Sequence, residues 1–221
     1  ENKLSVIPGN LSDFTRLMRH PDYDQFHYDV ILVRVAPSKD GLTHSLGPNS
    51  DMIMTILRNR PNIKVIAEIN PAVPVTMGDN VIRADQITAK FESRTELAGP
   101  AVVPPNEIDA RIGDHLGRLV NSGATLQLGI GNIFSGLPAG LQAHGKNHLK
   151  ISTEMFGDPM KQMMESGVAE TAETGFAYGS KDLYRWLNNN KVVRFVETEY
   201  VNDPGRIASI DNFHAINTAL Q

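Results

Sequence analysis

Cysteine is absent from this 221-residue sequence, and its absence excludes disulfides, thiolate metal sites and cysteine nucleophiles together. No apolar run approaches the roughly 20 residues that a membrane-spanning helix needs. An excess of positive charge is also missing: the formal net charge is −4. We therefore expect no bulk attraction to nucleic acid or to an anionic membrane. A cysteine-free chain fits the cytoplasm, which is the expected location.

What is present is ordinary for a globular protein, with 41% hydrophobic and 21% charged residues. The length suffices for one large or two small domains. The chain opens with Glu-Asn-Lys rather than Met, and no signal-peptide pattern follows, so we expect it to be a piece of a longer protein.

Segments typical of strands alternate along the chain with segments typical of helices. The expected strands or extended segments are Leu4–Ile7, Val30–Ala36, Ile63–Ile69, Gln86–Phe91, Leu126–Ile130, Leu149–Ser152, Phe176–Gly179 and Val192–Val196. One expected helix contains Phe14, Leu17 and Met18, and another runs from a cap at Ser50 to Pro61. Further helices are expected at Ile108–Val120, which ends before Gly123, at Asp158–Met164, and after a cap at Ser180. This alternation predicts an α/β fold with parallel sheets.

A proline-rich stretch, AGPAVVPPN, lies between Ala98 and Asn106. Such a composition is typical of an extended connector. It predicts two similar open-sheet domains, residues 1–104 and 105–221.

The stretch from Thr125 to Gly157 contains the most suggestive chemistry. A buried strand is followed by Gly129 and Gly131, whose lack of a Cβ atom allows a sharp turn and the close approach of a ligand. Backbone N–H groups at such a turn suit a phosphate or a developing oxyanion. The next predicted strand carries Glu154 just beyond its end, where ligands bind in open α/β sheets.

Taken alone, Gly129, Gly131 and Glu154 also fit interpretations in which they have no role in catalysis. The glycines also fit a plain strand-to-helix turn, and Glu154 fits a solvated carboxylate. A dinucleotide-binding turn is a further alternative, although Phe134 stands where its third glycine would be.

The polar residues elsewhere do not assemble into another site. The seven histidines are scattered, and His144 and His148 lie in a polar loop, so no metal site is expected. Ser135 lies in IFSGL, which lacks the G-x-S-x-G elbow of a hydrolase nucleophile.

Several ordered motifs together resemble the acetyl-CoA hydrolase/transferase family, which includes acetate and 4-hydroxybutyrate CoA-transferases. The similarity covers essentially the whole chain and is carried by IPGNLSDF, HSLGPNSD, VIAEINPAVP, GIGNI, STEMFGD, FAYGSKDLY and EYVNDPGRIASIDNFHAINTAL. Two departures are Phe134, where the family often has proline, and Thr43-His44 before the Ser-Leu-Gly run, where it has an aromatic residue.

The resemblance implies two domains of CoA-transferase type, with the active site at their interface and with further sequence on both sides of this chain. It implies that Glu154 is the catalytic nucleophile. The coenzyme A site would include the glycine turn, Gly129, Ile130, Gly131, Asn132 and Ile133. Gly47 and Asn70 are expected to line the site from the first domain.

The resemblance also implies the reaction. A CoA-transferase of this family moves CoA between an acyl-CoA and a small carboxylic acid through acyl-glutamyl anhydride and glutamyl-CoA thioester intermediates. Two alternatives remain: an acyl-CoA hydrolase using the same site, and a non-catalytic CoA- or dinucleotide-binding fragment. We expect no permanently bound cofactor, with coenzyme A serving as substrate, and a homo-oligomer without nucleic-acid or membrane partners.

Overall fold

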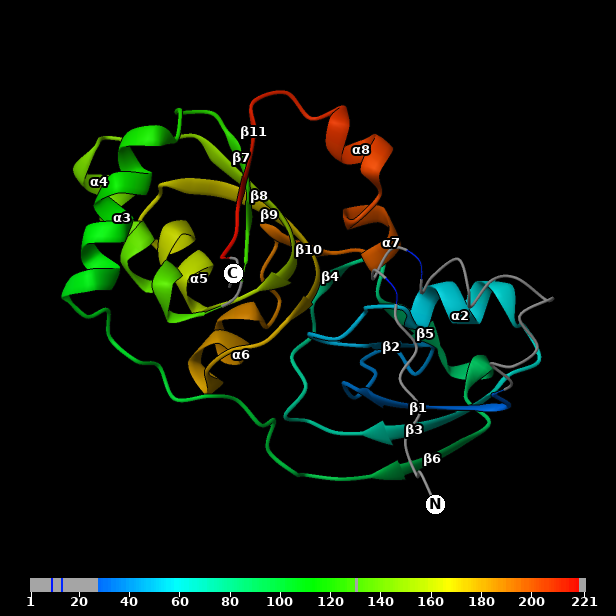
Figure 1. Cartoon of the computed structure of the whole chain (residues 1–221). Coiled ribbons are helices and arrows are strands. Elements are labelled where there is room, and N and C mark those ends of the chain that lie inside the picture. The colour runs from blue at the N-terminus through cyan, green and yellow to red at the C-terminus, as the bar shows by residue number, and fades with distance from the viewer. Residues whose placement is uncertain (1–8, 10–12, 14–27, 130, 219–221) are drawn as a thin grey trace, which may run out of the picture.

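The computed structural model describes residues 9, 13, 28–129 and 131–218. The expected strand Leu4–Ile7 and the expected helix around Phe14 lie outside these residues. The described chain forms a three-stranded sheet and a six-stranded sheet, both parallel, and a two-stranded antiparallel ribbon (Figure 1). The predicted α/β fold with parallel sheets is confirmed.

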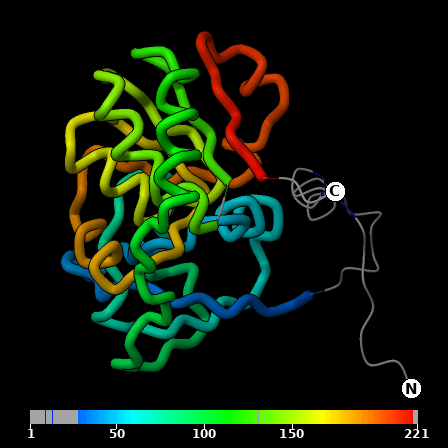
Figure 2. Tube along the Cα trace, turned by 60° about the vertical axis from the view of Figure 1, so that its left-hand side comes forward, coloured from blue at the N-terminus to red at the C-terminus, as the bar shows by residue number. Residues whose placement is uncertain are grey.

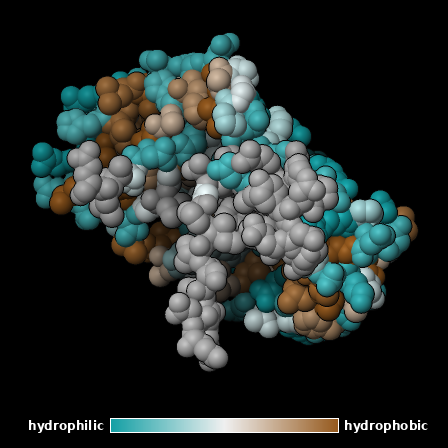
Figure 3. All heavy atoms as spheres, turned by 45° about the vertical axis from the view of Figure 1, so that its right-hand side comes forward, coloured by the Kyte–Doolittle hydropathy of each residue, from teal (hydrophilic) through white to brown (hydrophobic). Residues whose placement is uncertain are grey.

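The smaller sheet has the strand order β1-β3-β6. Its elements are β1 (Val30–Val35), β3 (Lys64–Ile69) and β6 (Ala89–Glu92), with the ribbon β2 (Thr43–Ser45) and β5 (Val81–Arg83), the helix α2 (Ile53–Asn59) and the turn η2 (Ala84–Gln86). Alternate β1 side chains pack with α2 and the ribbon in one core. The opposite face of this sheet is exposed: Leu32 is 75% exposed, although the nearly all-apolar run of β1 predicts that helices cover both faces. Exposed apolar side chains appear brown in Figure 3.

The larger sheet has the strand order β11-β7-β8-β9-β10-β4. Its strands are β4 (Met77–Gly78), β7 (Thr125–Leu128), β8 (Leu149–Phe156), β9 (Ala169–Ala177), β10 (Val193–Phe195) and β11 (Phe213–Ile216). The strand β4 precedes the proline-rich connector yet pairs with β10. The pairing of β4 with β10 requires glycine at position 78, because a Cβ atom there would lie 2.0 Å from the Phe195 carbonyl oxygen.

Helices cover both faces of the larger sheet. They are α3 (Glu107–Leu119), η3 (Asn132–Gly136), α4 (Leu137–Ala143), α5 (Asp158–Glu165), α6 (Lys181–Leu187), α7 (Thr198–Val201) and α8 (Pro204–Ala208). Figure 1 shows α3, α4 and α5 on one side of the sheet and α7 and α8 on the other. The core between the sheet and its helices includes Leu126, Ile151, Met163 and Phe195.

Pairs of glycines set the close packing of α3 against α4, which lie side by side in Figure 2. Gly113 and Gly117 are one helical turn apart on α3, and Gly136 and Gly140 are equally spaced on the facing segment. A Cβ atom at Gly140 would lie 1.9 Å from the Gly113 carbonyl oxygen. This four-residue spacing of glycines was not among the features predicted from the sequence.

Two local predictions were wrong. Ser50 does not cap α2; its hydroxyl donates to the Gly175 carbonyl oxygen at 2.8 Å, which ties the α2 segment to β9, and Met52 occupies the cap position. The strand after the glycine turn does not end at Ser152. It continues to Phe156, because pairing with β9 persists through Phe156, so Glu154 lies within β8.

Candidate functional site

The carboxyl end of β7 lies at a change of direction in the larger sheet. From β7 the chain adds β8, β9 and β10 successively on one side, and then returns to place β11 on the other side of β7. Ligands in open α/β sheets bind in the crevice at such a switch point. The Gly129 N–H donates to the Ile216 carbonyl oxygen of β11 at 2.9 Å, so the glycine turn begins inside this crevice.

The glycine turn adopts a conformation that favours glycine. Gly131 has φ +124° and ψ 163°, and a side chain there would be strained although its first atom would meet only Ile133 at 3.9 Å. Asn132 and Ile133 open the short η3 turn that follows. Ile130 lies outside the described residues. Gly131 is therefore suited to close approach by a ligand rather than to tight packing.

Glu154 projects from β8 beside the end of β7. The hydroxyl of Thr153, the preceding residue, donates to the Leu128 carbonyl oxygen at 3.0 Å. Gly129 and Glu154, which follow these two residues, are therefore neighbours on adjacent strands at this end of the sheet. The Glu154 side chain is half-buried, and its backbone carbonyl oxygen accepts a hydrogen bond from Thr174 on β9 at 3.1 Å. The structure thus brings two of the predicted site segments together.

Asn202, between α7 and α8, fixes the carboxylate of Glu154. Its side-chain N–H donates to Glu154 Oε2 at 3.1 Å. Sequence reasoning missed this partner, since 48 residues separate the two positions. The one available signal was the Asp203-Pro204 pair next to Asn202, which marks the start of α8.

An ion-pair cluster holds α8 against the same face of the sheet. The Arg206 guanidinium donates to Glu173 Oε2 at 2.6 Å and to the Ser152 hydroxyl at 3.0 Å, and it lies 4.2 Å from the centre of the Tyr200 ring. Glu173 also accepts from Arg194 at 2.7 Å. Ser152 precedes Glu154 by two strand positions, so both side chains face the α7–α8 segment.

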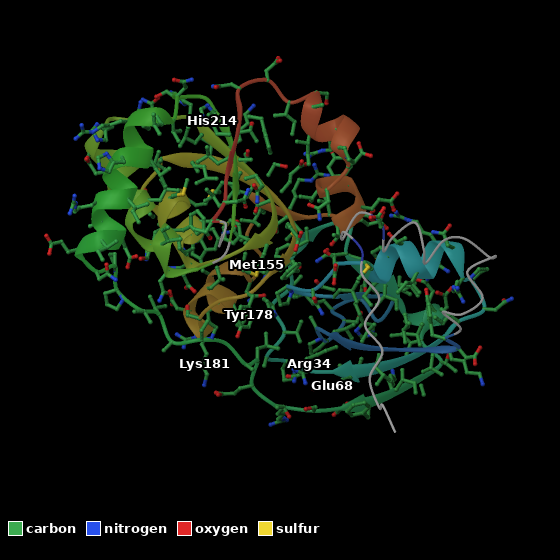
Figure 4. The ribbon with its side chains drawn as sticks, in the orientation of Figure 1. Arg34, Glu68, Met155, Tyr178, Lys181 and His214 are labelled. Carbon is green, nitrogen blue, oxygen red and sulfur yellow. The ribbon has the colours of Figure 1, made fainter. Side chains whose placement is uncertain are left out.

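A cavity of about 360 Å³ adjoins the glycine turn on the other face of β8. Gly129, Gly131 and Met155 line it together with the proline-rich connector. Met155 follows Glu154, and successive strand residues point to opposite faces. Figure 4 shows Met155 and Tyr178, which also lines this cavity, between the larger sheet and the connector.

Gly47 and Asn70 shape loops near the smaller sheet. Gly47 has φ +66°, and its carbonyl oxygen accepts a hydrogen bond from the Thr76 hydroxyl at 2.7 Å. Asn70 is fully buried; its side chain donates to Glu68 at 3.0 Å and accepts from the Ala72 N–H at 2.8 Å. Hydrogen bonds, chiefly from Arg34, hold the pKa of Glu68 below its usual value.

One buried acid near α7 has a perturbed pKa. Burial raises the pKa of Glu197, although the Arg58 guanidinium, 2.7 Å from Glu197 Oε1, acts in the opposite direction. This residue opens α7, the helix that leads to Asn202.

The part of the chain that the structure describes contains no group of three or more His, Asp or Glu side chains placed to hold a metal ion. His144 pairs with Asp114 at 2.7 Å, and His148 pairs with Glu170 at 2.5 Å. In the same residues no helix is long and apolar enough to cross a membrane.

Comparison with known proteins places these features in a family. The profile of the acetyl-CoA hydrolase/transferase C-terminal domain matches residues 179–221. The chain is 33% identical to 4-hydroxybutyrate coenzyme A transferase of Clostridium kluyveri over 87% of this chain and 46% of that protein. It is 32% identical to succinyl-CoA:cyclohexane-1-carboxylate CoA transferase of Geobacter metallireducens over 97% of this chain and 49% of that protein.

Among solved structures, 4-hydroxybutyrate CoA-transferase of Porphyromonas gingivalis superposes with a TM-score of 0.83 at 31% identity, covering 94% of this chain and 54% of that one. The chain spans about half the length of these relatives. The shared sequence and the shared arrangement of parallel sheets show that this chain belongs to the acetyl-CoA hydrolase/transferase family of CoA-transferases.

Proposed function

We propose that the protein is a CoA-transferase that moves CoA from an acyl-CoA to a carboxylic acid, with Glu154 as the covalent nucleophile. The observation that carries this proposal is the position of a half-buried carboxylate beside the glycine turn, in the crevice at the end of β7. The names of the relatives support CoA transfer in general. They name different acids, so they do not identify the acyl group that this protein transfers.

The chemistry follows from the residue types. The Glu154 carboxylate attacks the thioester carbonyl, the C–S bond breaks, and an acyl-glutamyl anhydride and free CoA thiolate result. The thiolate then attacks the glutamyl carbonyl, which releases the first acid and leaves a glutamyl-CoA thioester. A second acid reverses both steps. No net oxidation occurs, and CoA stays covalently bound to Glu154 between the two halves of the cycle.

Two features support a carboxylate in this role. Asn202 holds one oxygen of Glu154, which restricts the side chain to fewer orientations before attack. Backbone N–H groups of the glycine turn would stabilise the oxyanion that forms at the thioester carbon. If water enters in place of the second acid, the same residues would hydrolyse acyl-CoA.

The arrangement of the two halves is also part of the proposal. We infer domains 1–104 and 105–221 with the active site between them, supported by the hydrogen bond from Ser50 to Gly175 and by the pairing of β4 with β10. Gly47 and Asn70 stay predictions as lining residues. A homo-oligomeric state, a cytoplasmic location and the lack of a permanent cofactor also stay predictions.

A covalent adduct tests the function. The intact protein is incubated with acetyl-CoA, digested and analysed by mass spectrometry, and we expect a CoA adduct on the peptide that contains Glu154. Glu154→Gln keeps the shape but removes the attacking charge, so adduct and transfer should both disappear. Glu170→Gln is the matched control, because Glu170 is an exposed carboxylate that bonds only to His148 among its described neighbours. An adduct on another residue, or normal turnover by Glu154→Gln, would refute the assignment.

Competing ligands distinguish the remaining alternatives. CoA thioesters should bind in preference to NAD, because Phe134 fills the place of the third dinucleotide-binding glycine and is 3% exposed in the core. Calorimetric titration that found tight NAD binding and no CoA binding would favour the dinucleotide alternative. Binding of acyl-CoA without any adduct would favour a non-catalytic binding protein.

A further inference from the structure

A short segment of the smaller-sheet half, Pro48–Asp51, lies along the carboxyl-terminal end of β9. The Ala177 N–H donates to the Pro48 carbonyl oxygen at 2.7 Å, and the Asp51 N–H donates to the Gly175 carbonyl oxygen at 3.0 Å. Asp51 has φ +32°, a positive value that is uncommon for residues other than glycine, Asn and Asp. These hydrogen bonds fix Asp51 against the larger sheet.

Asp51 makes two hydrogen bonds to Thr198, the first residue of α7. The Thr198 hydroxyl donates to Asp51 Oδ1 at 2.7 Å, and the Thr198 N–H donates to the Asp51 carbonyl oxygen at 3.3 Å. Thr198 is fully buried, so its hydroxyl would be costly to leave without a partner. Figure 1 shows α7 beside α2, the helix that follows Asp51, and the Thr55 hydroxyl of α2 donates to Glu199 at 3.5 Å. Asp51 therefore fixes the position at which α7 begins.

The helix α7 extends this constraint to the carboxylate of Glu154. The Asn202 N–H donates to the Thr198 carbonyl oxygen at 2.8 Å, and the Asn202 side chain donates to Glu154 Oε2 at 3.1 Å. Gly175 separates α7 from β8 with little space to spare. A Cβ atom at Gly175 would lie 2.8 Å from the Thr198 hydroxyl oxygen and 3.1 Å from the Glu154 carbonyl oxygen. A displacement of Thr198 therefore also displaces the side chain that holds Glu154.

We propose that Asp51 is a positioning residue of the active site: through Thr198 and Asn202 it sets the orientation of the Glu154 carboxylate. The inference rests on the proposed function, in which this carboxylate attacks the thioester carbonyl. It gives the smaller-sheet half a part in the reaction, because that half holds the helix that orients the nucleophile. A protein without this contact binds acyl-CoA but attacks it more slowly, since fewer orientations of the carboxylate are productive.

Variants on both sides of the contact test the proposal in the intact protein. Thr198→Val keeps the shape of the side chain and removes the hydroxyl, and Asp51→Gly removes the carboxylate while it permits the positive φ. We expect each to lower kcat for CoA transfer by about tenfold, with KM within about twofold of the wild type. Thr198→Ser and Asp51→Asn keep the donor and the acceptor, so both should retain most of the activity. Unchanged kcat in both Thr198→Val and Asp51→Gly would overturn the proposal.

Asn188→Ala is the matched control. The Asn188 side chain accepts a hydrogen bond from the Val75 N–H at 2.9 Å, which also joins the two halves, but it follows α6, which Figure 1 shows apart from α7. We expect kcat of this variant to stay within about twofold of the wild type. A tenfold loss would mean that any weakened contact between the halves lowers activity, and it would refute a specific role for Asp51.

Coupling to Asn202 separates positioning from a general loss of stability. In an Asn202→Ala background the connection from α7 to Glu154 is already broken. Adding Thr198→Val should then lower kcat by less than about twofold, because the two residues act in series. A further tenfold loss would show that Thr198 acts independently of Asn202 and would refute the proposal.

Chemical labelling of Glu154 separates this proposal from the proposed function. Carbodiimide coupling of an amine to Glu154, followed by peptide mass spectrometry, reports access to the carboxylate without acyl-CoA or turnover. Thr198→Val and Asp51→Gly should label severalfold faster than the wild type, and Asn188→Ala should not. That result would support the positioning role even if the wild type transferred no CoA, which would refute only the function. Equal labelling of all four proteins would refute the positioning role even if the wild type were an active transferase.

Discussion

Asn202 donates a hydrogen bond to the carboxylate of Glu154 at 3.1 Å, although the two residues lie on different elements. Replacing Asn202 by Ala removes a hydrogen bond to a charged group, worth about 1.5–3 kcal/mol. We expect CoA transfer by the intact protein to fall by about ten- to a hundredfold. Asn202→Asp should be worse, because it places a second carboxylate beside Glu154. Steady-state kinetics checks this order, and equal activity of all three proteins would contradict it.

Arg206 should matter for activity more than Arg194, although both bind Glu173. Arg206 alone of the two also bonds to Ser152, and its side chain is 18% exposed against 59% for Arg194. Arg206→Met should let α8, and with it Asn202, move away from the sheet. We expect kcat to fall by about tenfold or more, as small displacements of positioning groups do. Arg206→Lys should restore part of the loss.

Arg194→Met serves as the control and should keep kcat within about twofold, since exposed ion pairs contribute little. Thermal unfolding of each variant separates displacement of α8 from general loss of stability. Equal losses of kcat in Arg194→Met and Arg206→Met would show that the contact with Ser152 is unimportant.

Gly140→Ala should destabilise the fold strongly. The added methyl carbon would lie 1.9 Å from the Gly113 carbonyl oxygen, so α3 and α4 must separate. We expect the free energy of unfolding to fall by about 3 kcal/mol, the upper part of the range for overpacked cores. Gln142→Ala, at an exposed position of the same helix, should change it by less than about 0.5 kcal/mol. Urea denaturation of both variants compares them, and similar midpoints would disprove the close-packing argument.

Gly131→Val should impair ligand binding more than folding. The φ of +124° at this turn is unfavourable for a β-branched residue, and the side chain would project into the cavity. Calorimetric titration with acetyl-CoA should show binding weakened at least about tenfold, while thermal unfolding shifts by only a few degrees. Unaltered affinity in a folded variant would indicate that the turn is merely structural.

Glu197 should make stability depend on pH. Burial raises its pKa in the folded protein, so the folded state holds this proton more tightly than the unfolded chain. Its contribution therefore becomes less favourable as pH rises from its ordinary pKa through its raised pKa, and stays unfavourable above that. Glu197→Gln, which cannot ionise, should therefore gain stability relative to the wild type as the pH rises above the ordinary glutamate pKa of about 4.3. Denaturation at several pH values measures the difference, and a constant difference would contradict the expected shift.

The sequence predicted those elements whose signals are local. The apolar run of β1 and the helical stripe of α3 appeared near their predicted positions, as did the Ser180 cap of α6, whose hydroxyl accepts from the Leu183 N–H at 3.1 Å. Periods of two and 3.6 residues reflect which side chains must leave water, so they can be read without tertiary information. The very short strands β2, β4 and β5 were missed, because two or three residues show no period.

The features of the candidate site also divide into those that the sequence predicted and those that only the structure revealed. The sequence by itself determined the family, the alternation of strands and helices and the glycine turn, and it singled out Glu154 as the candidate nucleophile, since these depend on residue type and order along the chain. Only the tertiary structure decided that Glu154 lies within β8, that Asn202 and Arg206 stand on its side of the sheet, and that the connector forms one wall of a cavity. Those relationships depend on strand order and on contacts between distant segments, which no local pattern encodes.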